Sequence, residues 1–267
     1  MASGVRLLLV VTVTVLLMAC GGAPPQPRPV LAQRADAAAL SANRATQAGN
    51  DEEAVELWRS ALDLRQAVDD WPGAGEARLG LAQVQLRLRQ PDAAARVLLG
   101  MPDEVLYPAA LRARAAYQLA LVAQGRSDEA RAWLARANEL CPAPCAIAVP
   151  LRNLGARLRL AAGDPAGALA IVNAPLSGDV APVERAHAGR IRAEALGALG
   201  QVAQALTELE SVVVLDRRLA EPAYLADDFS LQYRLALAIG DEGLAREAQT
   251  RLSAICAAAA VPACRRQ

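Results

Sequence analysis

The stretch Gln124-Gly125-Arg126-Ser127-Asp128-Glu129-Ala130 shows how this chain is built. A helical pattern leads into it over residues 111–123, and beyond the glycine a second pattern places Ala130, Leu134 and Ala137 on one helix face. Glycine tolerates the backbone conformation that ends a helix in a tight turn. A small residue five positions later allows the second helix to pack closely against the first. The stretch therefore predicts a helical hairpin.

The same arrangement recurs along the 267 residues. The predicted turns, 36 to 40 residues apart, stand at Gly49, Arg89, Gly125, Gly163, Gly200 and Gly240. The residue five positions after each turn is always alanine, at Ala54, Ala94, Ala130, Ala168, Ala205 and Ala245. Aromatic residues make up only 3% of the chain, whereas a β-sandwich favours aromatic and β-branched residues. We therefore expect an all-α protein made of about six helical hairpins.

This pattern resembles the tetratricopeptide repeat, a helix-turn-helix unit of about 34 residues with small residues at comparable positions. The resemblance covers residues 35–256 and is strongest from Leu111 to Pro142. It implies a right-handed α-α solenoid that forms one domain. Arg89 in place of a turn glycine and Pro175 within the fourth second helix depart from the family pattern.

The first 34 residues predict export and a membrane anchor. The apolar run within residues 1–19 is too short to span a membrane and has the dimensions of a secretory signal peptide. It ends in Leu17-Met18-Ala19-Cys20, which resembles a bacterial lipobox, where cleavage precedes a cysteine that carries diacylglycerol. The alternative is an ordinary signal peptide, with Cys20 incidental. Residues 20–34 then form a proline-rich tether, or alternatively a disordered stub with no required reach. By resemblance to enteric sorting rules, Gly21 favours the periplasmic face of the outer membrane.

Four cysteines remain beyond this site, at Cys141, Cys145, Cys256 and Cys264. An even number of cysteines in an exported chain implies disulfides, and four cysteines allow three connectivities. We expect the two local pairs, Cys141 with Cys145 and Cys256 with Cys264. The second pair would pin the C-terminal tail, residues 257–267, onto the last helix.

Several classes of function lack support in the sequence. Without lysine the chain has no P-loop lysine or Schiff-base lysine, and with one histidine it has no paired-histidine zinc site, so we predict neither cofactor nor metal. Equal numbers of basic and acidic residues, 28 each, give no support for nucleic-acid binding. An enzyme would need His187 beside Glu184 and a serine, for which the candidates are Ser177, Ser211 and Ser230. No nucleophile elbow supports it, so we predict that the chain is not an enzyme.

In tetratricopeptide-repeat proteins the first helix of each hairpin lines a groove that binds a peptide or a partner helix. By this resemblance the polar residues predicted to bind a partner are Asn43, Gln83, Asn153, Arg157, His187, Arg190, Glu194 and Arg234. The arginines suggest an anionic or C-terminal peptide, because a guanidinium pairs with a carboxylate through two hydrogen bonds. The alternative is that these residues belong to ordinary solvated helix faces. The lysine-and-asparagine clamp of chaperone-binding relatives is absent, since Ala39 stands where its lysine would be.

These expectations combine into a lipid-anchored periplasmic scaffold or adaptor that binds other envelope proteins. By resemblance, the candidate systems are pilus or secretin assembly, outer-membrane protein insertion and peptidoglycan machinery. One alternative is a periplasmic carrier of a lipid or small ligand, which would need an enclosed apolar cavity. The other is the enzyme that uses His187.

Overall fold

The computed structural model describes residues 29–174, 179–259 and 261–265. Within these ranges the chain forms α-helices and one short 3₁₀ helix, and it has no strand. The α-helices are α2 (Val30–Ala48), α3 (Asp51–Ala67), α4 (Trp71–Arg87), α5 (Pro91–Leu98), α6 (Ala109–Val122), α7 (Ser127–Glu139), α8 (Ala148–Ala161), α9 (Pro165–Asn173), α10 (Pro182–Ala198), α11 (Val202–Leu219), α12 (Pro222–Ala238) and α13 (Glu242–Ala258).

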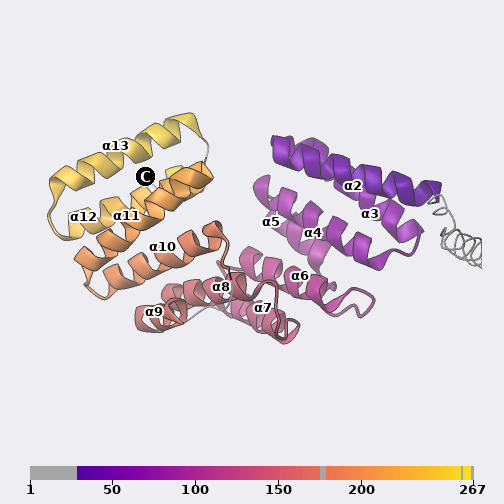
Figure 1. Cartoon of the computed structure of the whole chain (residues 1–267), viewed down its shortest axis with the longest axis horizontal. Coiled ribbons are helices and arrows are strands. Elements are labelled where there is room, and N and C mark those ends of the chain that lie inside the picture. The colour runs from indigo at the N-terminus through magenta and orange to yellow at the C-terminus, as the bar shows by residue number, and fades with distance from the viewer. Residues whose placement is uncertain (1–28, 175–178, 260, 266–267) are drawn as a thin grey trace, which may run out of the picture.

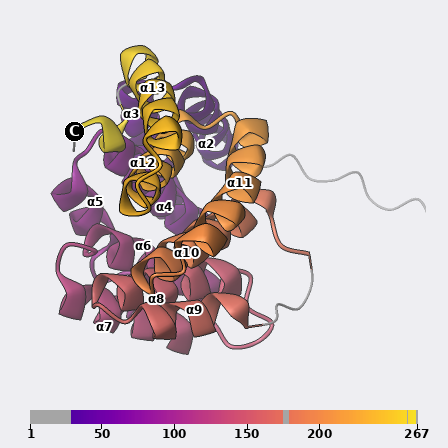
Figure 2. The ribbon, with the colours of Figure 1, turned by 90° about the vertical axis from the view of Figure 1, so that its left-hand side faces the viewer.

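Consecutive helices pair into six hairpins, from α2/α3 to α12/α13, and each hairpin packs on the next. The stack curves into an arch, with α2/α3 and α12/α13 at its two ends and α6 to α9 in the middle (Figure 1). In the view turned by 90°, helices α10 to α13 lie in front of α2 to α4 (Figure 2). The predicted all-α solenoid of about six hairpins is confirmed.

Every predicted turn joins the two helices of one hairpin. Four of the turn glycines have a positive φ of 71° to 78°, at Gly49, Gly163, Gly200 and Gly240. Arg89 adopts the same left-handed region with φ of 61°, so the turn keeps its geometry without glycine. Gly125 is not among the glycines with a positive φ. Its turn is closed by the backbone N–H of Arg126, which donates to the carbonyl of Ala123 at 2.7 Å.

The alanines five positions after the turns lie where the two helices of each hairpin cross. All are buried, with at most 4% of their surface exposed: Ala54, Ala94, Ala130, Ala168, Ala205 and Ala245. Four of the residues seven positions before the turns are alanines with 0% exposure, at Ala42, Ala82, Ala156 and Ala193. A methyl side chain on both helices allows their backbones to approach closely.

The array begins earlier than predicted. Helix α2 starts at Val30 and not at Ala35, because residues 30–34 contain no proline and extend the helix back to Pro29, its N-cap. The signal peptide, Cys20 and most of the predicted tether lie outside the described residues. Among the residues that are described, no helix is both long and apolar enough to cross a membrane.

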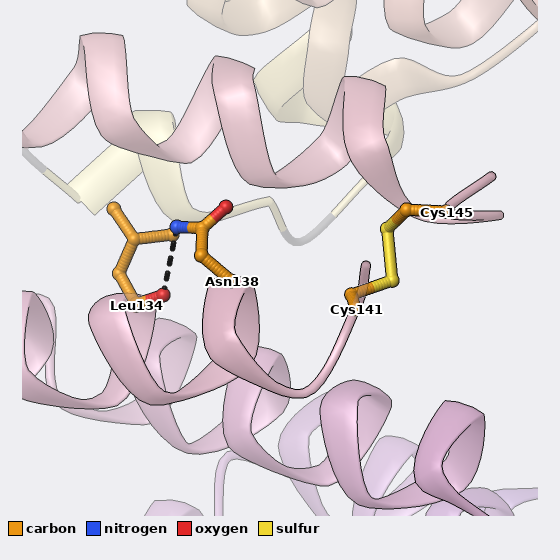
Figure 3. Close-up of a disulfide and its surroundings, with 4 residues drawn as sticks. All are labelled: Leu134, Asn138, Cys141 and Cys145. Atoms are coloured by element: carbon orange, nitrogen blue, oxygen red, sulfur yellow. Dashed lines mark hydrogen bonds between the residues drawn. A yellow bond between two sulfur atoms is a disulfide. The ribbon is translucent and has the colours of Figure 1, made fainter. Parts of the chain in front are cut away.

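Both short-range disulfides are present. The bond between Cys141 and Cys145 joins the end of α7 to the start of α8 (Figure 3). One turn before it, the side-chain amide of Asn138 donates to the carbonyl of Leu134 at 2.9 Å (Figure 3). The bond between Cys256 and Cys264 joins α13 to the 3₁₀ helix Pro262–Arg265.

Candidate functional site

One side of α8, α10 and α12 carries a row of charged residues, which we call the first-helix face. Arg157, Glu194 and Arg234 each stand six positions before the turn of their hairpin, so successive hairpins bring them together. A guanidinium nitrogen of Arg157 lies 2.8 Å from Glu194 Oε2, and one of Arg234 lies 3.8 Å from Glu194 Oε1. The row carries one net positive charge, and the Arg234 side chain is 61% exposed.

An aromatic and polar cluster lies closer to the start of α10. The rings of His187 and Tyr224 meet edge to face, with centroids 4.9 Å apart. The side-chain amide of Asn153 donates to Glu184 Oε2 at 2.7 Å and to the Glu184 carbonyl at 3.1 Å. Helices α8, α10 and α12 therefore supply this cluster as well as the charged row.

His187 and Tyr117, a partly buried ring of α6 near the cluster, are uncharged near neutral pH. Burial, with Arg190 and Arg157 adding to it, lowers the pKa of His187 to about 4. Burial, with Glu184 and Tyr224 adding to it, raises the pKa of Tyr117 on α6 to about 12. Both rings therefore stay neutral near pH 7, one of them on α10, the helix that also carries Glu194.

The geometry around His187 does not assemble a catalytic triad. Its Nδ1 lies 3.9 Å from Glu184 Oε2, beyond hydrogen-bond distance. None of the hydrogen bonds of the described residues joins His187 to Ser211 or Ser230, and Ser177 lies outside those residues. With a pKa of about 4, the imidazole is also a weak base.

The prediction that Arg190 faces a partner is wrong. Its side chain is only 6% exposed, and it is held by the buried carboxylates of Asp216 and Asp228. Asn153 also lies in the interior, at 5% exposure, because it binds Glu184. Both residues stabilise the packing of helices and do not form part of a surface.

The residues predicted in the N-terminal half are exposed but separate from this cluster. Asn43 on α2 donates to the carbonyl of Ala39 in its own helix at 3.0 Å, and Gln83 lies on α4. Nothing in the described residues brings either side chain to the row of Arg157, Glu194 and Arg234. Only the C-terminal part of the predicted set therefore forms a site.

Two hollows open to solvent lie along the second helices instead. The larger, about 590 Å³, is lined by α9, the far side of α10 and α11, including Leu169, Leu196 and Thr207. The smaller, about 390 Å³, contains Arg152, which donates to the carbonyl of Ala174 just after α9, and Arg192, which donates to the carbonyl of Val172 within α9. Glu184 of the cluster also lines the smaller hollow, but neither hollow is lined by a residue predicted to bind a partner. In the described part of the chain no group of three His, Cys, Asp or Glu side chains is arranged to hold a metal ion.

Asp216 and Asp228, which hold Arg190, are not among the residues predicted from the sequence. A signal was available, because Ala205, Leu209, Val212 and Asp216 follow each other at spacings of four, three and four residues. Such a stripe marks the buried face of a helix, so an acid on it requires a buried partner.

Comparison with known proteins agrees with the fold. No family model matches the chain, and no curated protein sequence matches it. The solved structure of Pseudomonas aeruginosa pilF is 18% identical in sequence, covers 85% of this chain and 94% of its own, and superposes with a TM-score of 0.54. A Podosopora anserina protein with nearly identical TPR-like repeats is 20% identical over 84% of this chain and 95% of its own, with a TM-score of 0.36. The similarity to pilF is one of fold, and the chain has the fold of a TPR-like solenoid.

Proposed function

We propose that this chain is a scaffold that binds a partner protein of the cell envelope through its first-helix face. TPR-like solenoids generally serve as scaffolds for protein–protein interaction, which supports the coarse part of the proposal. The observation that carries it is the row of Arg157, Glu194 and Arg234, together with the paired rings of His187 and Tyr224 nearer the starts of α10 and α12. Three successive hairpins contribute to this surface, so a bound segment would span the repeats.

The site favours a peptide with one carboxylate and one apolar or aromatic side chain. Arg234 is the most exposed cation of the row and stands next to the already paired Glu194, so it offers its remaining donors to a carboxylate. His187 and Glu194 are seven residues apart on α10, which corresponds to about 10 Å along a helix. An extended peptide covers that distance with about three residues. We infer that about three residues of the partner separate its carboxylate from its apolar side chain.

Reversing the charge of Arg234 tests this site. Arg234→Glu places two acids against each other and should weaken capture of the partner from solubilised envelopes. Arg246→Glu is the matched control, because Arg246 is 74% exposed and lies on α13, away from the row. Equal capture by both variants would remove the first-helix face from the proposal.

The location of the scaffold is the second part of the proposal. Lipidation of Cys20 would hold the array at the periplasmic face of the outer membrane through the proline-rich stretch that follows this cysteine. Pilus or secretin assembly, outer-membrane protein insertion and peptidoglycan machinery are the systems in which such a scaffold would act. Replacing Cys20 with serine should release the protein into the soluble periplasmic fraction. Continued sedimentation with membranes would count against the lipid anchor.

A further inference from the structure

Arg190 forms a buried ionic cluster with two carboxylates from different helices. Its Nε on α10 donates to Asp228 Oδ1 on α12 at 2.6 Å, and its Nη2 donates to Asp216 Oδ2 on α11. Both aspartate side chains are 0% exposed. The cluster therefore joins the fifth hairpin, α10/α11, to the last hairpin, α12/α13, inside the protein.

Two features of this cluster do not fit two ionised carboxylates. One guanidinium with two carboxylates leaves a net negative charge where water does not reach, which is costly. In addition, Asp216 Oδ1 and Asp228 Oδ2 are buried and accept no hydrogen bond. Both carboxylates are bound to the same guanidinium group of Arg190, yet two ionised carboxylates have no proton to donate to each other.

One proton removes both difficulties. We propose that Asp216 and Asp228 share a single proton in mild acid, which makes the cluster neutral and fastens α12 to α10 and α11, and that loss of this proton as the pH rises weakens the attachment of the last hairpin. A carboxylic acid then donates to its neighbouring carboxylate while Arg190 donates to both. Two carboxyl groups that share one site are expected to bind one proton more tightly than either alone.

Among the described residues that act on the cluster, no group other than Arg190 supplies a positive charge. On α10 the cluster faces Glu184 and His187, whose imidazole is neutral, and on α12 it faces Tyr224 and the acidic Asp227. The cations on the neighbouring helices have other partners: Arg157 of α8 pairs with Glu194, and Arg251 of α13 pairs with Glu247 and covers the ring of Phe229. Tyr117 of α6, whose pKa is about 12, stays uncharged.

The sign of the pH dependence follows from burial. Burial raises the pKa of Asp228 from 3.8 to about 7, against the opposing effect of Arg190, and burial also raises the pKa of Asp216. The folded protein therefore holds a proton between about pH 4 and 7 that the unfolded chain has lost. Between pH 4 and 7 the equilibrium constant for folding therefore decreases by up to about tenfold per pH unit, and above pH 7 it stays constant.

The cluster also supports part of the first-helix face. Arg190 Nη2 lies 3.5 Å from the carbonyl of Tyr224, and its guanidinium lies 5.6 Å from the centroid of that ring. Tyr224 and Arg234 are both carried by α12, so release of this helix would displace both. This consequence rests on the function proposed above, whereas the shared proton is measured without any partner.

The variant Asp228→Asn tests the proposal, because asparagine has a similar shape, stays neutral at every pH, and donates an amide proton to Asp216. Asp128→Asn is the control, since Asp128 is 93% exposed. Amide hydrogen exchange of the purified proteins measures the equilibrium constant for local opening of α12. We expect the ratio of this constant in the wild type to that in Asp228→Asn to rise at least tenfold between pH 5 and 7 and then to stay constant. The ratio of wild type to Asp128→Asn should not change.

Infrared spectroscopy of the wild type tests the proton directly and does not depend on how a variant folds. At pH 6 exposed carboxyl groups are ionised, so a carbonyl band of a protonated carboxyl group should be seen in the wild type and in Asp128→Asn. It should be absent from Asp228→Asn, or from Asp216→Asn if the first variant does not fold. A wild type without this band at pH 6, or a pH-independent ratio of opening constants between wild type and Asp228→Asn, would overturn the proposal.

Discussion

Replacing Gly80 with alanine tests how closely the hairpins pack. Gly80 lies within α4, and a Cβ built on it would lie 2.5 Å from Cε2, 2.6 Å from Cζ2 and 2.8 Å from Cδ2 of Trp58 on α3. The indole is rigid and only 6% exposed, and its Nε1 donates to Thr46 Oγ1 at 3.3 Å. Relief of the overlap therefore requires α3 and α4 to move apart or the indole to leave its hydrogen bond.

The expected size of the effect comes from two opposing contributions. Alanine in place of glycine inside a helix stabilises it by about 1 kcal/mol. Overpacking of a buried contact costs about 1–3 kcal/mol, and an overlap with three atoms of one rigid ring belongs at the upper end. Gly80→Ala should therefore lower the free energy of unfolding by about 1–2 kcal/mol.

Urea unfolding followed by circular dichroism measures this difference. Gly243→Ala on α13 is the matched control, because its nearest contact is Asp241 Oδ1 at an ordinary 3.4 Å, and it should be neutral or stabilising. In the Gly80→Ala background, Trp58→Leu should cost less stability than it does in the wild type, since the smaller side chain removes the overlap. A Gly80→Ala protein as stable as the wild type would refute the close approach of α3 and α4.

Three further substitutions probe other parts of the array. Leu209→Ala should lower the free energy of unfolding by about 2–5 kcal/mol in urea, because Leu209 is fully buried between α10, α11 and α12; a loss below about 1 kcal/mol would contradict that packing. His187→Gln should make the protein less sensitive to acid. The pKa of His187 is about 4 in the folded protein and 6.5 in the unfolded chain, so the wild type loses stability as the pH falls from 6.5 to 4. Identical thermal unfolding of the two proteins from pH 7 to 4 would argue against the buried imidazole. Replacing both Cys141 and Cys145 with alanine should lower the free energy of unfolding by about 2 kcal/mol, the value for so short a loop. The control is the double variant Ser41→Ala and Ser60→Ala, at two exposed positions. Equal stability of the two double variants would show that the disulfide contributes nothing.

The hairpin register could be predicted because it depends on residues close together in the sequence. A turn at Gly163 and a crossing at Ala168 are separated by five residues, so the requirement for a tight bend and the requirement for a small side chain are both visible locally. Arg89 shows the limit of this reasoning, because its positive φ is imposed by the two helices that it joins and not by its own preference.

The candidate site could be predicted only in part, because its charges are paired across hairpins. Arg157 and Arg190 look equivalent in sequence, yet Arg157 meets Glu194 near the surface while Arg190 is enclosed by carboxylates 26 and 38 residues away. Which arginine points outward depends on the neighbouring helices, so helical periodicity alone did not separate them. The start of α2 at Val30 differs from the prediction because Pro29 is the last proline of the run and serves as the N-cap, so that residues 30–34 can already be helical.

Crosslinking in intact cells tests the proposed scaffold most directly. A photoreactive amino acid at position 234 lies on the first-helix face, and the same group at position 246 lies on α13. After illumination, mass spectrometry should identify an envelope protein attached through position 234 and not through position 246. Absence of any attached protein at position 234, or equal attachment at both positions, would contradict the account.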